Sequence, residues 1–177
     1  MSQGALTIWF TGLPGAGKTT TALALAKAIK EQGGSTPLLL DGDHVRSGLS
    51  SDLGFSATDR AEQVRRAGEV ALLAAQQGFT SLVSLVSPNA DARDAVRRRH
   101  LDHGIGFVEI FVATPIEVCT ARDPKKLYAQ AKAGTLKLMT GAGDPYESPE
   151  NPDLIIETHL MSTDEIIEQI LAALAQR

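Results

Sequence analysis

Several features that would place a protein in other classes are scarce or missing in this sequence of 177 residues. Cys119 is the only cysteine, which excludes an internal disulfide and a metal cluster built from cysteines. The formal net charge is −4, so no general positive field attracts nucleic acid or an anionic membrane. No apolar run approaches the ~20 residues that span a bilayer, and no secretion signal is recognisable. We therefore expect a cytoplasmic protein that binds neither membrane nor nucleic acid.

What is present is an alternation of apolar strand segments with helical segments, without repeats or a dividing linker. The strands are expected at Leu6–Thr11, Thr36–Asp41, Phe79–Val86, Gly106–Ala113 and in "DLIIET", and Thr36–Asp41 reads as a strand buried on both faces. Helices are expected from Lys18 to Gln32, from about Thr58 to Gln77 with a capping signal in "SATD", and from Ala90 to His103. Two more helices are expected after a cap in "TPIE" (Thr114–Glu117) and after a cap in "STDE". This order predicts one domain over residues 1–177, with a five-stranded parallel sheet covered by helices on both faces.

The segment from about residue 123 to residue 151 interrupts the alternation. It contains glycine and proline punctuation in "TGAGDPYESP" and little periodic pattern. A connection of this length inside a compact domain is more often a functional lid than a passive loop. Its lysines would bring positive charge over a site when the lid closes, and closure would exclude water; they are Lys125, Lys126, Lys132 and Lys137.

The segment Gly12-Leu13-Pro14-Gly15-Ala16-Gly17-Lys18-Thr19 matches the G-x-x-x-x-G-K-[ST] phosphate-loop motif and is followed by Thr20. It lies between an expected strand and an expected helix, as the motif requires. The glycines allow backbone N–H groups to point into one concavity, at the positive end of the helix dipole. Lys18 can reach the β- and γ-phosphates, and the Thr19 hydroxyl can bind Mg²⁺. The motif predicts a nucleoside triphosphate and a three-layer α/β fold of the P-loop NTPase or nucleotide-kinase type.

The remaining strand ends favour a small-molecule kinase among phosphate-loop proteins. "SLVSLVSP" ends in Ser87-Pro88, where motor and transport ATPases usually have a carboxylate, and no N-K-x-D guanine-binding motif occurs. An acidic pair instead follows the second strand, where Asp41 and Asp43 flank Gly42. This edge of an open α/β sheet faces the ligand crevice, where two carboxylates can hold hydrated Mg²⁺ and accept a proton from a hydroxyl. The alternative is a tight Asp-Gly turn that caps the next helix.

Arginines after this pair are candidates for holding an anionic acceptor. Arg65 and Arg66 have glutamates at helical spacing, so part of this charge belongs to a solvated helix face. Arg46 and Arg60 have no such local partner and stand at the starts of elements, which favours them as ligands of an anion.

In combination, these motifs resemble the adenylylsulfate (APS) kinase family over roughly residues 5–158. The matching segments are "GLPGAGKTT", "LDGDHVRSGLSSDLGFSATDR", "RRAGEVA", "SLVSP", "RDPKKLYAQAKAG" and "TGAGDPYESPENP". The resemblance implies transfer of the ATP γ-phosphoryl group to the 3′-hydroxyl of adenylylsulfate, which yields 3′-phosphoadenylylsulfate and ADP. It also implies dependence on Mg²⁺, a homodimer and a place in sulfate assimilation.

The same resemblance implies a role for each matching residue. Gly12 to Thr20 would bind ATP, with Arg122 near its base and with Thr19 and Asp41 at the metal. Asp43 would orient or deprotonate the 3′-hydroxyl, and Ser87 would lie near the transferred phosphoryl group, at a position discussed as phosphorylated in some members. The acceptor nucleotide would contact Arg46, Phe55, Arg60, Gln63 and Arg65, and on the lid side Lys125, Leu127 and Met139.

The chain departs from the family pattern at several of these positions. Gln63 replaces the usual asparagine, Asn89 an aromatic residue and Lys126 a glycine, and Met139 stands where the family has the phenylalanine of F-T-G. Ala142-Gly143 follows in place of I-D. Phe55 would then stack on one face of the acceptor adenine with Met139 as a softer partner, at a cost of about 1 kcal/mol. We favour adenylylsulfate as the acceptor; a related nucleotide anhydride, or a catalytically weak nucleotide-binding regulatory domain, remain as alternatives.

Overall fold

A computed structural model describes residues 5–135 and 139–176 and contains one five-stranded sheet. Its strands are β1 (Leu6–Thr11), β2 (Leu38–Asp41), β3 (Ser81–Ser84), β4 (Gly106–Val112) and β7 (Leu154–Ile156). They lie in the order β2-β3-β1-β4-β7, and every neighbouring pair is parallel. The predicted parallel sheet is confirmed.

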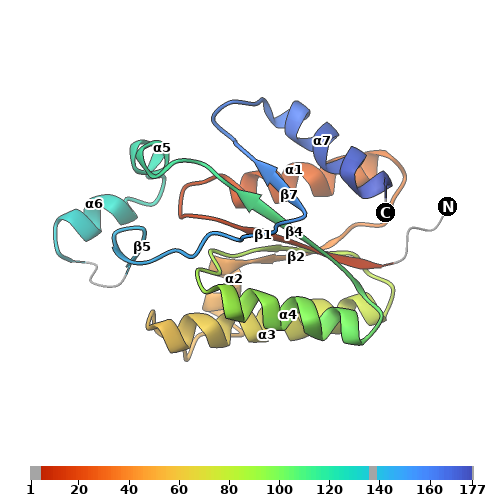
Figure 1. The fold of residues 1–177 in the computed structure, drawn as a ribbon, viewed down its shortest axis with the longest axis horizontal. Helices are drawn as coiled ribbons and strands as arrows, with labels where there is room; N and C mark the ends of the chain where they lie inside the picture. Colours follow the sequence, from red (N-terminus) through yellow and green to blue (C-terminus); the bar gives the residue numbers. More distant parts are fainter. Residues whose placement is uncertain (1–4, 136–138, 177) are drawn as a thin grey trace.

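Helices cover both faces of this sheet (Figure 1). α1 (Lys18–Glu31) and α7 (Thr163–Ala175) lie on one face, while α3 (Ala57–Gln76) and α4 (Ala90–Asp102) lie on the other. The shorter elements α2 (Gly42–Ser47), α5 (Ile116–Arg122), α6 (Leu127–Lys132), β5 (Met139–Thr140) and β6 (Gly143–Asp144) complete the described part. Of the described helices, none combines the length and the apolar character that crossing a bilayer requires.

The alternation of side chains along β1 builds two cores. Ile8 and Phe10 point into the layer shared with α1 and α7, and Trp9 points into the layer shared with α3 and α4. All three residues are fully buried, so the central strand is apolar on both faces. This packing fixes the carboxyl end of β1, where the phosphate loop begins.

Two predicted helix starts are confirmed by their caps. The Ser56 hydroxyl accepts a hydrogen bond from Asp59 N at the start of α3. At the start of α7, Ser162 and Glu165 form a reciprocal capping box. The capping prediction for "TPIE" was wrong, because Pro115 occupies the N-cap position without a side-chain cap. Thr114 instead directs its hydroxyl to the phosphate loop.

Two further expectations need correction. The second strand begins at Leu38 and forms an edge of the sheet, so Leu39 is partly exposed instead of being buried on both faces. An edge strand has a hydrogen-bonded neighbour on one side only, and the sequence of one strand does not reveal its place in the sheet. The segment 123–151, read as irregular, contains the short helix α6 and the β5–β6 pair among its described residues. α2, which directly follows β2, was not predicted.

Candidate active site

A cavity of about 800 Å³ lies at the carboxyl end of the sheet, and residues of α5, α6 and β5 contribute to its lining. These three elements lie beyond this end of the sheet (Figure 1). Residues after β1, β2 and β3 line it, as expected for the ligand crevice of an open α/β sheet. The predicted site residues that line this cavity are Pro14, Gly15, Gly17, Lys18, Thr19, Thr20, Asp41, Asp43, Arg46, Phe55, Arg60, Gln63, Ser87, Arg122, Lys125, Leu127 and Met139.

Glycine is required at two corners of the phosphate loop. Gly12 has φ +149°, and a Cβ there would lie 2.6 Å from the carbonyl oxygen of Val112. Gly17 has φ +106°, and a Cβ there would lie 3.1 Å from the Thr158 side chain. Both corners therefore combine left-handed backbone with close packing, which fixes the path of the loop around the cavity.

Lys18 begins α1 and bends back onto its own loop. Its Nζ donates to the carbonyl oxygens of Gly12, at 2.9 Å, and Leu13, at 2.8 Å. The side chain is buried, and this desolvation lowers the pKa of Lys18 to about 8. Because burial disfavours the charged ammonium, an anion that enters the loop would bind Lys18 strongly.

Three oxygen ligands lie together beside Lys18. The Thr19 hydroxyl donates to Asp41 Oδ2 at 2.7 Å and lies 3.3 Å from Ser84 Oγ. Asp41 Oδ1 also accepts a hydrogen bond from Asp43 N at 3.0 Å, so Asp41 caps α2 as well. The alternative interpretation of Asp41 as a helix cap is therefore confirmed, and the same carboxylate also contacts Thr19 of the phosphate loop.

These oxygens fit a magnesium ion that binds mainly through phosphates and water. Hydroxyl and carboxylate oxygens are the ligands that Mg²⁺ accepts, and such sites use one or two protein carboxylates and not a complete cage. Within residues 5–135 and 139–176, no group of three or more His, Cys, Asp or Glu side chains could hold a metal by itself.

Asp43 faces the cavity and forms an ion pair with Lys125. Both side chains are more than half exposed, so the pair adds little to stability. Lys125 comes from the segment that begins the expected lid, and the pair therefore links that segment to the acidic pair.

Phe55 and two arginines form a second wall of the cavity. The Arg46 guanidinium lies 4.4 Å from the centre of the Phe55 ring, and that of Arg60 lies 5.5 Å from it. Arg46 also donates to the carbonyl oxygen of Gly54, and Arg60 forms an ion pair with Asp144. Burial lowers the pKa of both arginines from the ordinary value. Phe55 is nevertheless 47% exposed and lines the cavity, so part of its ring can contact a ligand.

Two more predicted residues line the cavity as buried groups. Met139 is buried in the core cluster below α1 and α7. The Gln63 side chain donates to the carbonyl oxygen of Gly42 at 3.2 Å, which ties α3 to the turn of the acidic pair.

Arg122 closes the opposite end of the phosphate loop. It donates to the Thr158 hydroxyl at 2.7 Å and to the Thr158 carbonyl oxygen at 3.0 Å. The hydroxyls of Thr158 and Thr114 both donate to the carbonyl oxygen of Ala16, at 2.7 and 2.9 Å. This arrangement anchors the loop from the C-terminal part of the chain.

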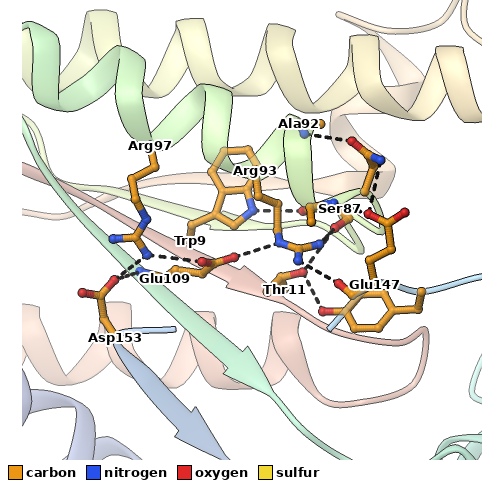
Figure 2. A network of polar contacts seen from close by, with 12 residues as sticks. Trp9, Thr11, Ser87, Ala92, Arg93, Arg97, Glu109, Glu147 and Asp153 are labelled. Atoms are coloured by element: carbon orange, nitrogen blue, oxygen red, sulfur yellow. Dashed lines mark hydrogen bonds and ion pairs between the residues drawn. The ribbon is translucent and has the colours of Figure 1, made fainter. Parts of the chain in front are cut away.

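Ser87 lies after β3 in a left-handed backbone conformation, with φ +46°. Its hydroxyl accepts a hydrogen bond from Trp9 Nε1 at 2.9 Å (Figure 2). The residue is almost fully buried and lines the cavity. Trp9 therefore belongs to the core and also holds the Ser87 hydroxyl.

Not every predicted site residue lines the cavity. Arg65 makes two hydrogen bonds to Glu62, at 2.7 and 2.8 Å, on an exposed face of α3. The helical-spacing argument for a solvated face thus applies to it, and the acceptor contact predicted for Arg65 has no support in this geometry. Gly12, Leu13 and Ala16 act through their backbone and not as cavity lining. Of the lysines in the expected lid, only Lys125 lines the cavity within the described residues; Lys137 lies outside those residues.

Some site residues were not predicted from the sequence. The Tyr128 hydroxyl donates to the carbonyl oxygen of Pro14 at 3.0 Å, and Thr158 anchors Ala16. Ser84 approaches Thr19 from the last position of β3. A polar residue at the carboxyl end of a buried parallel strand was a usable signal for Ser84, whereas Tyr128 and Thr158 depend on contacts between distant segments.

Comparison with known proteins agrees with this geometry. The family model described as "Adenylylsulphate kinase" matches residues 4–157. The adenylyl-sulfate kinase of Enterobacter sp. (strain 638) is 48% identical over 169 residues, which cover 96% of this chain and 82% of that protein. That of Paraburkholderia xenovorans (strain LB400) is 47% identical, over 98% of this chain and 94% of its own. A structure of the Mycobacterium tuberculosis APS kinase CysC in complex with AMPPNP and APS superimposes with a TM-score of 0.93. It is 44% identical, and the match covers 97% of this chain and 98% of that one.

Proposed function

The chain belongs to the adenylylsulphate kinase family and is a phosphotransferase with an alcohol group as acceptor, and we propose how its cavity carries out the transfer. ATP binds at the phosphate loop, adenylylsulfate binds between Phe55 and the lid side, and Asp43 receives the proton of the 3′-hydroxyl. The observation that carries this proposal is that Asp41 contacts Thr19 of the phosphate loop while Asp43, two residues later, lines the same cavity. The donor and acceptor sites thereby meet at one short turn.

The donor site holds the triphosphate by main-chain and ammonium groups. When ATP enters, Lys18 exchanges its two carbonyl acceptors for phosphate oxygens, so its buried positive charge gains negatively charged partners. Arg122 borders the nucleotide base beside Thr158. Thr19, supported by Asp41, would hold Mg²⁺, which when bound neutralises charge on the phosphates.

The acceptor site places an aromatic face beside cationic groups. Phe55 stacks on the adenine, with Met139 as a partner and Gln63 beside it, and Arg46 and Arg60 bind the anionic phosphate and sulfate. Both guanidinium groups are partly desolvated, so an anion binds them more tightly than it would bind exposed arginines.

The chemical step needs positioning more than covalent help from the protein. The 3′-oxygen attacks the γ-phosphorus, the bond from this phosphorus to the β,γ-bridging oxygen breaks, and ADP leaves. Asp43 takes the proton from the 3′-hydroxyl after Lys125 has left it for an anionic group of a substrate. Ser87 donates its hydroxyl proton toward the transferred group.

The expected lid and the quaternary structure complete the proposal. Residues 123–135 and 139–151 supply Lys125, Leu127 and Met139 to the cavity, which supports a lid that excludes water during transfer. We also propose one domain over residues 1–177, a homodimer and a cytoplasmic location, on the resemblance to the family. Light scattering of the purified chain tests the dimer directly.

An acceptor assay tests the proposed function. ADP release is coupled to NADH oxidation while adenylylsulfate, its 3′-deoxy analogue and adenosine 5′-monophosphate are compared in the presence of ATP and Mg²⁺. Rapid release with adenylylsulfate alone supports the proposal. Equal release with the 3′-deoxy analogue would show that the 3′-hydroxyl is not the acceptor group.

A further inference from the structure

A strained turn beside the cavity is held by a buried arginine that the mechanism above does not use. Ser87 has φ +46°, which is uncommon for a residue other than glycine and persists where the surroundings determine it. Arg93 of α4 donates from Nη1 to the Ser87 carbonyl oxygen at 2.6 Å. Arg93 is 2% exposed, so this hydrogen bond is shielded from water.

The same guanidinium binds two other segments (Figure 2). Its Nη2 donates to the Glu147 carbonyl oxygen at 2.7 Å, and its Nε lies 2.9 Å from Glu109 Oε1. One planar group thereby joins the turn after β3, strand β4 and the part of the expected lid segment that contains Tyr146 and Glu147, called here the return segment. A lysine in this place could not reach all three partners, because it carries one nitrogen and no rigid fork.

The return segment has further contacts with the strand ends that carry the site. Tyr146 donates its hydroxyl to Thr11 Oγ1 at 2.9 Å, since the Thr11 hydroxyl proton is itself given to the Val86 carbonyl oxygen at 2.8 Å. Burial raises the pKa of Tyr146 to about 12, so it remains a donor at neutral pH. The Glu147 carboxylate accepts from Ala90 N at the start of α4.

From these contacts we infer that Arg93 is a positioning residue for phosphoryl transfer. It fixes the Ser87 turn and the lid return segment in one arrangement. In this arrangement the Ser87 hydroxyl accepts a hydrogen bond from Trp9, so its own proton remains available to donate to the transferred group. The inference rests on the proposed role of Ser87. Because Arg93 contacts no residue of the phosphate loop in any of these hydrogen bonds, its loss should affect transfer more than ATP binding.

Arg97 provides a matched control on the same helix. It also pairs with Glu109, at 3.2 Å, and with Asp153 at 2.7 Å, but these contacts involve neither the Ser87 turn nor residue 147 (Figure 2). Arg93→Lys and Arg97→Lys both weaken the pairing of Glu109 and both keep the charge. A role in stability alone would give the two variants the same kinetics.

The experiment compares kcat, the KM for ATP and the KM for adenylylsulfate, together with one spectroscopic signal. Trp9 is the only tryptophan, so the indole N–H gives a single NMR resonance that reports its hydrogen bond to Ser87. For Arg93→Lys we expect kcat to fall about 10- to 100-fold, since hydrogen bonds from a charged donor are lost, with the KM for ATP nearly unchanged. The indole resonance should shift in Arg93→Lys and stay in place in Arg97→Lys.

Equal kinetics for the two variants, or an unshifted indole resonance in Arg93→Lys, would overturn the inference. If Arg93→Lys does not fold, Tyr146→Phe decides the question with the same measurements, because it removes only the hydroxyl that contacts Thr11. We then expect a several-fold lower kcat and a shifted indole resonance, and unchanged values would again overturn the inference. The resonance needs no turnover, so a wild-type chain that is inactive with adenylylsulfate would contradict the proposed function without deciding this one.

Discussion

Replacing Lys18 by methionine should separate the stability of the protein from its activity in a pH-dependent way. In the folded chain the Lys18 ammonium is buried among carbonyl groups, and its pKa falls from 10.5 to about 8. Between these two values the unfolded chain binds a proton that the folded chain has lost. The free energy of unfolding of the wild type therefore rises with pH through this window, relative to a variant without the ammonium.

The size of the effect follows from the two pKa values. Between pH 7 and pH 9.5, the wild type should gain about 2 kcal/mol of unfolding free energy relative to Lys18→Met. Urea unfolding of both proteins at the two pH values measures this difference, and Lys27→Met, which changes an exposed lysine of the same helix, is the control. Turnover should be abolished in Lys18→Met at both pH values. A wild-type-minus-variant difference that stays constant with pH would refute the burial argument for Lys18.

Three shorter predictions concern other parts of the molecule. Phe55→Ala should raise the KM for adenylylsulfate about 5- to 10-fold, because stacking is lost, and should change the KM for ATP little. Phe79→Ala removes a similarly exposed ring away from the cavity and should leave both KM values unchanged. Gly68→Ala should destabilise the protein by about 1–3 kcal/mol in thermal unfolding, because the new Cβ would lie 2.8 Å from both Val96 methyl carbons. If adding Val96→Ala to this variant does not recover stability, the clash with Val96 is not the cause of the loss. Lys125→Ala should raise the KM for adenylylsulfate several-fold and leave the melting temperature within a degree or two, since its ion pair with Asp43 is exposed, and a large stability loss would contradict this.

Local motifs made the donor side of the site predictable. The phosphate loop needs glycine at fixed positions and a lysine at the start of a helix, so its residues are identified by spacing alone. The acidic pair follows a recognisable strand, and parallel strands end at the same edge of the sheet. The five-stranded sheet followed from the same alternation of strands and helices.

Contacts between distant segments could not be predicted in this way. Nothing in the local sequence indicates that Trp9 binds Ser87, or that Arg93 joins residues 87, 109 and 147. The exposure of Leu39 depends on the place of β2 at the edge, which strand order decides. Arg65 was assigned to the acceptor through the family pattern, although its helical spacing to an acidic residue indicated a surface pair.

The sequence left two alternatives open: a different nucleotide anhydride as the acceptor, or a catalytically weak nucleotide-binding regulatory domain. Met139 occupies the lid position of the usual phenylalanine, and it is buried and lines the cavity. The relatives at 47–48% identity are adenylyl-sulfate kinases over nearly the whole chain. The relatives therefore support an adenylyl-sulfate kinase despite this substitution, and the contact of Met139 with the acceptor stays a prediction.

Adenylylsulfate-dependent ADP release by Asp43→Asn tests most directly whether the acidic pair directs the acceptor toward the phosphate loop. The variant keeps the size of the side chain and removes its basicity, and Asp52→Asn, which changes another exposed ion-paired carboxylate outside the cavity, is the control. We predict that kcat falls about 10²- to 10⁴-fold in Asp43→Asn, with ATP affinity and thermal stability retained, and that Asp52→Asn behaves as the wild type. A kcat for Asp43→Asn within a few-fold of the wild-type value would contradict the account.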